Sequence, residues 1–129
     1  MLAVDTNVVV RFLVNDDAEQ SPRARTLVNG SAIFLPLTVL LESEWVLRSV
    51  YAIGPKAAAK ALRLFVSLPS VSVERPTIAA RALDWLDAGL DFADALHLAT
   101  SDHCEAFVTF DRQFIKQAKR SAGLAIRMP

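Results

Sequence analysis

The chain has 129 residues, with 14 basic and 14 acidic side chains and a hydrophobic share of 53%. This length fits one domain over residues 1–129 with its own hydrophobic core, and the composition excludes disordered and low-complexity proteins. Because the charges cancel, attraction to a nucleic acid has to come from local basic patches. The lone Cys104 excludes an internal disulfide, and we expect a cytoplasmic protein with no signal peptide and no membrane span.

Strands and helices alternate in the predicted secondary structure. In the first half, apolar runs and turn residues predict a strand at 2–4, helices at 7–14 and 19–28, a strand at 32–35, and helices at 39–51 (with Thr38 as N-cap) and 56–66. The second half predicts a strand at 71–73, helices at 76–88 and 91–103, a strand at 106–110, a helix at 112–121 and a strand at 124–126. This order predicts an α/β fold with a central parallel sheet of four to five strands, flanked by helices on both faces.

Four aspartates stand at helix starts, where two roles compete. Asp5 and Asp111 each follow a predicted strand and precede a helix, so each is either a helix cap or a ligand at the carboxyl end of a parallel strand. Asp91 and Asp94 lie in the first turn of one helix. Capping is the better interpretation for Asp91, whereas the position of Asp94 leaves both roles open.

Glu42 differs from these aspartates because it lies inside a predicted helix, where it cannot act as a cap. An acid on a largely apolar helix has to reach solvent, a partner or a cation, because burying a bare charge is costly. Glu44 is two residues away and points to a different side of the helix. One of the two glutamates is expected to face solvent, and spacing does not say which.

Several carboxylates gathered at one sheet edge would repel one another unless a cation were bound. Carboxylate oxygens are hard ligands that select Mg²⁺ or Mn²⁺ over Zn²⁺. The combination of Asp5, Glu42, Asp94 and Asp111 therefore predicts a divalent metal site, provided that the fold brings them together.

Four segments, in order along the chain, resemble the successive motifs of PIN domains, and most closely those of VapC-type toxins of bacterial toxin–antitoxin pairs. These segments are Val4-Asp5-Thr6-Asn7, Glu42-Ser43-Glu44-Trp45-Val46-Leu47, Asp91-Phe92-Ala93-Asp94-Ala95-Leu96-His97 and Thr109-Phe110-Asp111. The resemblance implies that Asp5, Glu42, Asp94 and Asp111 form the metal site and that Glu44 is a bystander. It makes Thr6, Asn7 and Thr109 secondary candidates, which orient ligands or water. Asp91 is a further secondary candidate, either as a ligand or, as we favour, as a helix cap.

The resemblance also implies a Mg²⁺- or Mn²⁺-dependent endoribonuclease that hydrolyses RNA, forms a homodimer and is inhibited by a VapB-type antitoxin. We expect RNA phosphates to contact the basic helix after Asp111, at Lys116, Lys119 and Arg120. For His97 we favour a packing role over a catalytic one.

Two alternatives stay open. The chain could be a housekeeping PIN nuclease that processes a structured RNA, or a non-catalytic α/β binding module whose acids only cap helices. A phosphoryl-transfer enzyme with Asp5 as nucleophile is disfavoured, because Asp5-Thr6-Asn7 lacks a second acid two residues on.

Overall fold

The computed structural model describes residues 1–119 and 123–129, which form an α/β fold with parallel strands. Arg120, one of the expected RNA contacts, lies outside these described residues. Along the chain the elements are β1 (Leu2–Ala3), α1 (Thr6–Val14), α2 (Gln20–Gly30), β2 (Ile33–Leu35), α3 (Leu37–Ser49), α4 (Pro55–Val66), β3 (Val71–Val73), α5 (Pro76–Asp87), α6 (Phe92–Ala99), β4 (Ala106–Val108), α7 (Arg112–Ala118) and β5 (Ala125–Arg127).

The five strands are divided between two parallel sheets. In the larger sheet, β1 pairs with β2 and β2 with β3, with Ile33 opposite Leu2 on one side and Val71 on the other. The smaller sheet pairs β4 with β5, with Phe107 opposite Ile126. The parallel α/β class is as predicted, but its strands do not form one continuous central sheet among the described residues.

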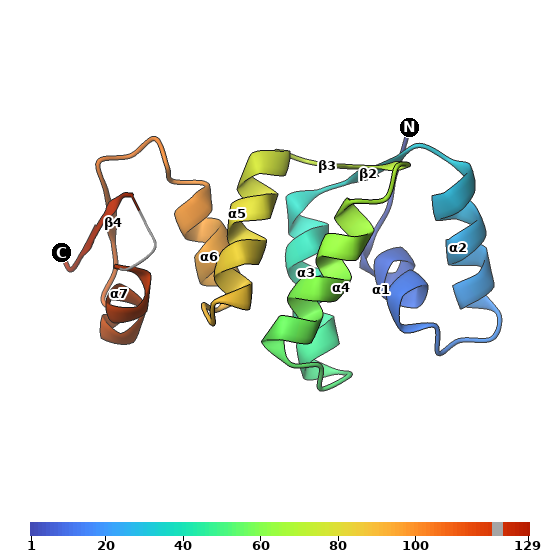
Figure 1. Ribbon diagram of the computed structural model, residues 1–129, viewed down its shortest axis with the longest axis horizontal. Helices are drawn as coiled ribbons and strands as arrows, with labels where there is room; N and C mark the ends of the chain where they lie inside the picture. The colour runs from blue at the N-terminus through green and yellow to red at the C-terminus, as the bar shows by residue number, and fades with distance from the viewer. Residues whose placement is uncertain (120–122) are drawn as a thin grey trace.

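The C-terminal elements account for this division. Figure 1 shows β4 and α7 at one end of the molecule, beyond α5 and α6, while β1 and α2 lie toward the other end. Phe107 of β4 packs edge-on against Phe114 of α7, with 5.5 Å between ring centroids, and Ala118 and Ile126 are buried. The C-terminal unit therefore buries apolar side chains within itself, and its position separates β4 from β1.

The main core lies between the helices that follow the larger sheet. Helix α5 packs on α4 and α6, and α3 contacts α1, α4 and α6. Their inward-facing side chains include Leu40, Leu62, Phe65, Leu83 and Phe92, all fully or almost fully buried. Burial of this apolar surface is the dominant stabilising contribution, and it fixes α3 and α6, which carry Glu42 and Asp94.

Most predicted boundaries are displaced by a few residues, and two of them change an assigned role or shorten a helix by a full turn. Thr38 is not the N-cap of α3: the helix begins at Leu37, with Pro36 in the capping position. The backbone N–H of Leu37 instead donates to a carboxylate oxygen of Glu74, 2.9 Å away and 37 residues along the chain. Helix α6 ends at Ala99 rather than at residue 103, because the chain turns at Thr100.

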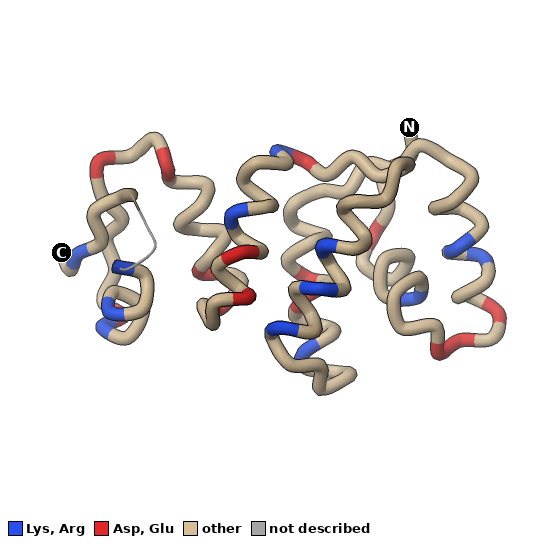
Figure 2. Tube along the Cα trace, in the orientation of Figure 1, with Lys and Arg blue, Asp and Glu red and all other residues tan. Residues whose placement is uncertain are grey.

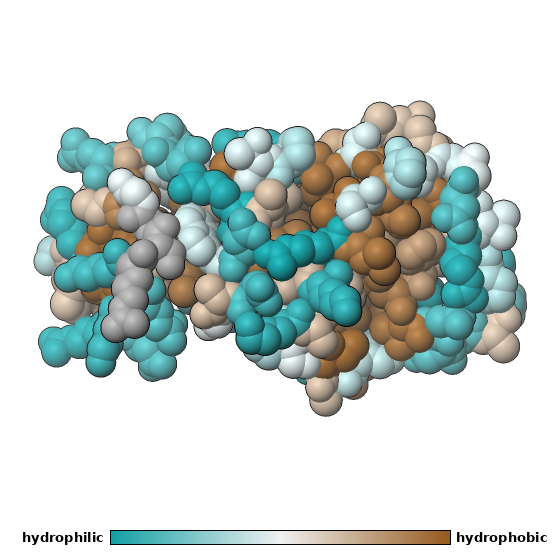
Figure 3. Space-filling view, viewed as in Figure 1, coloured by the Kyte–Doolittle hydropathy of each residue, from teal (hydrophilic) through white to brown (hydrophobic). Residues whose placement is uncertain are grey.

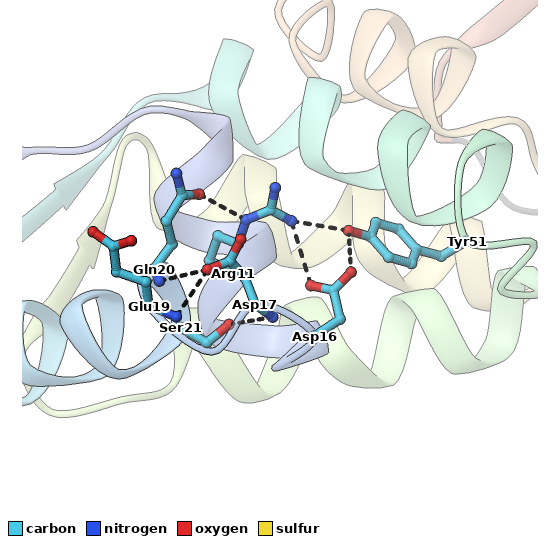
Figure 4. A network of polar contacts seen from close by, with 7 residues as sticks. All are labelled: Arg11, Asp16, Asp17, Glu19, Gln20, Ser21 and Tyr51. Carbon is cyan, nitrogen blue, oxygen red and sulfur yellow. Dashed lines mark hydrogen bonds and ion pairs between the residues drawn. The ribbon is translucent and has the colours of Figure 1, made fainter.

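A polar network holds α1 beside α2 and the end of α3 (Figure 4). The Arg11 guanidinium donates to Gln20 at 2.9 Å, to Asp16 at 3.3 Å and to the Tyr51 hydroxyl at 3.1 Å. The Tyr51 hydroxyl in turn donates to Asp16 at 2.9 Å. These bonds raise the pKa of Arg11, chiefly through Tyr51, and fix the helix that begins directly after Asp5.

None of the described helices has the length and apolar character that crossing a bilayer requires.

Candidate functional site

Asp5 ends the N-terminal strand segment and starts α1. Its backbone is extended, and its carboxylate accepts a hydrogen bond from the Val8 N–H at 3.4 Å. The capping interpretation is therefore confirmed, but the side chain is exposed and the cap occupies one oxygen. A carboxylate has about four lone-pair sites, so the cap leaves capacity for a cation or water.

Thr6 and Glu42 connect α1 to α3. The buried Thr6 hydroxyl donates a hydrogen bond to Oε1 of Glu42, which lies on the exposed side of α3. Since Thr6 follows Asp5 directly, this bond brings the helix start that carries Asp5 next to Glu42. Thr6 thus has the contact expected of a residue that orients a metal ligand. Asn7 is exposed and lines a groove of about 730 Å³ between α1 and α2.

Glu44 is buried on the opposite side of α3, with 1% of its surface exposed. Its carboxylate pairs with Arg48 one turn later, with Nε to Oε2 at 3.1 Å and Nη2 to Oε1 at 3.4 Å. This pair raises the pKa of Arg48, and the charge of Asp91 adds to the effect. The structure therefore distinguishes two glutamates that spacing could not. Glu42 faces solvent, and Glu44 holds a structural ion pair, which its i,i+4 spacing from Arg48 could have predicted.

Asp91 and Asp94 lie at the start of α6. Asp91 is the N-cap, and its carboxylate accepts from the Asp94 N–H at 3.2 Å, as the capping interpretation predicts. Partial burial raises the pKa of Asp94, as does the neighbouring negative charge of Asp91, while His97 lowers it and Asp111 raises it. A carboxylate whose charged form is disfavoured in this way gains from a nearby cation.

His97 is exposed on α6, so the expected packing role is wrong. The side chain lies one turn beyond Asp94 and lowers the pKa of that carboxylate.

Asp111 follows β4 and caps α7, where its carboxylate accepts from the Phe114 N–H at 3.0 Å. The Asp111 N–H donates to the Thr109 hydroxyl at 3.0 Å, so Thr109 holds the backbone of this turn. Lys116 and Lys119 are exposed on α7 or directly after it, and Figure 2 shows basic positions gathered on this helix and near the C-terminus.

The structure thus brings the acids together in two groups. Thr6 joins the segment of Asp5 to Glu42 through its hydrogen bond, while the charges of Asp91 and Asp111 both act on Asp94. Within residues 1–119 and 123–129, no three Asp, Glu, His or Cys side chains are close enough to hold one metal ion. The donor types fit a hard divalent cation, but the described arrangement does not join the two groups around one ion.

A known protein family matches most of the chain. A model of the PIN domain family matches residues 2–120, which include all four acids of the expected metal site. No curated protein matches the chain significantly.

Proposed function

Since this chain belongs to the PIN domain family, we propose that it is an endoribonuclease that uses Mg²⁺ or Mn²⁺ to hydrolyse RNA phosphodiester bonds. The observation that carries the proposal is the hydrogen bond from buried Thr6 to exposed Glu42, beside Asp5. A buried hydroxyl that orients an exposed carboxylate next to a second carboxylate suits a cation-binding site. Capping alone does not account for Glu42, because it lies in the interior of α3.

The proposed metal ligands are Asp5, Glu42 and Asp94, with Asp111 acting on the ion or on a water. In the metal-free arrangement these acids stand in two groups, which a bound ion would have to draw together. A divalent cation held by these residues would supply positive charge near the scissile phosphate and favour ionisation of a water. Hydrolysis of the phosphodiester by water would leave a 5′-phosphate and a 3′-hydroxyl. In the chain itself, Thr6 would orient Glu42, and Asp91 would position Asp94 by capping α6.

The ribonuclease proposal is tested by incubating the purified chain with labelled RNA in Mg²⁺ or Mn²⁺, and in parallel with EDTA. We expect cleavage only with metal, and loss of cleavage in Asp5→Asn and Glu42→Gln. Glu105→Gln is the matched control, because Glu105 is an exposed acid outside the proposed site. Cleavage that persists in EDTA, or full activity of a correctly folded Asp5→Asn variant, would overturn the proposal.

We further propose that the chain is the toxin of a toxin–antitoxin pair, acting on RNA in the cytoplasm as a homodimer. Two grooves support partner binding, one of about 730 Å³ between α1 and α2 and one of about 780 Å³ between α4 and α5. The second is lined largely by apolar side chains, among them Leu64 and Leu83. Figure 3 shows hydrophobic residues gathered on the visible face near α1 and α4.

Expression of the chain from an inducible promoter in cells distinguishes the toxin role from the housekeeping alternative. Growth arrest that is relieved by co-expressing a VapB-type antitoxin supports the toxin. Normal growth together with processing of a structured RNA would favour a housekeeping nuclease. Calorimetry that detects no binding of Mg²⁺ or Mn²⁺ at millimolar concentration would instead favour a non-catalytic module.

A further inference from the structure

Trp45 is an exposed aromatic side chain beside the proposed site. It lies on α3, three residues after Glu42, and 54% of its surface is accessible. Residues at i and i+3 of a helix are neighbours, with Cβ atoms about 5–6 Å apart. The indole is therefore on the same face of α3 as the carboxylate that Thr6 orients.

The opposite face of α3 explains why Trp45 faces outward. Leu40, Ser43, Glu44 and Leu47 are all buried, and they define the inner side of the helix. Burial of Glu44 with its Arg48 partner fixes the rotation of α3 about its axis, because turning the helix would expose the ion pair and bury Trp45.

The surroundings of Trp45 are polar. Its exposed neighbours one turn away on α3 are Glu42, Arg48 and Ser49, and the apolar neighbour Leu41 is partly buried. The cores of protein–protein interfaces are apolar and contain few charged residues. The surface around Trp45 differs from such a core, because Trp45 has charged neighbours. A flat, isolated aromatic in a polar setting is instead what stacking of a nucleic-acid base requires.

From this placement we propose that Trp45 stacks against an unpaired base of the RNA, next to the phosphate that is cleaved. The inference rests on the ribonuclease function proposed above and narrows its substrate to single-stranded segments. Bases within a duplex are stacked on one another, so their faces are not available to an indole. Because every base has a π-face, Trp45 would contribute affinity with little preference for sequence.

Kinetics with a single-stranded RNA oligonucleotide test the proposal. Since loss of one base–aromatic stack costs about 1–3 kcal/mol, we expect Trp45→Ala to raise KM by about 5- to 150-fold, with a smaller change in kcat. Trp45→Phe should retain most of the affinity, and Trp45→Leu, which keeps bulk without an aromatic ring, should not. Val50→Ala is the matched control, because Val50 is 64% exposed but lies after the end of α3.

Annealing the oligonucleotide to its complement should remove the difference between Trp45→Ala and the unsubstituted chain. An unchanged KM in Trp45→Ala would overturn the stacking role and leave the ribonuclease function intact. An equal loss in Val50→Ala would also overturn it, since the effect would not be specific to Trp45.

A binding measurement separates stacking from catalysis. Trp85 is the second of the two tryptophans and is only 8% exposed, so Trp85→Phe leaves Trp45 as the single tryptophan, which can be excited selectively over Tyr51. In EDTA, the oligonucleotide should quench the fluorescence of this variant, and an abasic residue at one position should reduce the quenching. Quenching without any cleavage in metal would retain the stacking site and reject the nuclease. Binding itself is measured separately, by the anisotropy of a labelled oligonucleotide. If the oligonucleotide binds but the Trp45 fluorescence does not change, the inference is overturned. It is also overturned if the oligonucleotide does not bind.

Discussion

The Thr6 hydroxyl donates a hydrogen bond to the Glu42 carboxylate, which is 36 residues away in the sequence. Thr6 is buried at the start of α1, whereas Glu42 is exposed in the interior of α3. The bond therefore connects the end of the first strand segment to the one expected acid that lies in the middle of a helix. Loss of this hydrogen bond should affect function more than folding, because the Glu42 carboxylate that accepts it is exposed to solvent.

Thr6→Val keeps the shape of the side chain but removes the donor. We expect metal affinity or activity to fall by about 10- to 100-fold, the usual effect of losing a partner that orients a ligand. Thr6→Ser restores the hydroxyl and should recover most of the activity. Titration of Mn²⁺ with each variant measures the effect, and a Thr6→Val protein with unchanged metal affinity would exclude this role.

Asp91→Asn separates capping from metal binding. Asn caps helices about as well as Asp does, so a residue that only caps α6 should tolerate this change with activity retained. Asp91→Ala removes the cap and should lower the free energy of unfolding by about 0.5–2 kcal/mol. A large loss of activity in a stable Asp91→Asn variant would instead identify Asp91 as a ligand.

Arg48→Ala should destabilise the protein, because it leaves the Glu44 carboxylate buried without its partner. Breaking a fully buried ion pair costs about 3–5 kcal/mol. Because the Arg48 side chain is 46% exposed, we expect a smaller loss of about 1–3 kcal/mol in urea unfolding. The double variant Glu44→Gln, Arg48→Met should be more stable than Arg48→Ala, and the opposite order would contradict this account.

Asp94→Asn should stabilise the metal-free protein. The pKa of Asp94 is raised, first by burial and then by the charge of Asp91. The folded protein thus binds the proton of the Asp94 carboxyl more tightly than the unfolded chain does. The stability that this protonation contributes is lost as pH rises through the folded pKa of Asp94. At neutral pH in EDTA, the neutral amide should raise Tm, and added Mg²⁺ should stabilise the unsubstituted chain more than the variant.

Asp17→Ala should destabilise the start of α2 at neutral pH. The Asp17 carboxylate accepts from the N–H groups of Gln20 at 2.7 Å and Glu19 at 3.0 Å, and these bonds lower its pKa. This contribution is present above the unfolded pKa and is lost as pH falls through the folded pKa. The Tm difference between Asp17→Ala and the unsubstituted chain should therefore shrink in acid, whereas a constant difference would point to another cause.

Local signals predicted most of the fold. Alternating apolar runs and helical spacing were enough to predict every helix and strand of the described residues, with most ends displaced by a few residues. The capping roles of Asp5, Asp91 and Asp111 were also accessible, because a cap acts on an N–H three residues along the chain. The order of the motifs predicted the PIN family.

Only the tertiary structure decided which glutamate of α3 faces solvent and how the strands are divided between sheets. Thr6 meets Glu42 through packing of α1 on α3, and Glu74 caps α3 across 37 residues. Such contacts depend on which faces of distant elements are buried together, and spacing within one segment carries no information about that. The sequence by itself determined the acidic residues and their order, whereas the division into an Asp5–Glu42 group and an Asp94–Asp111 group follows from how the helices pack.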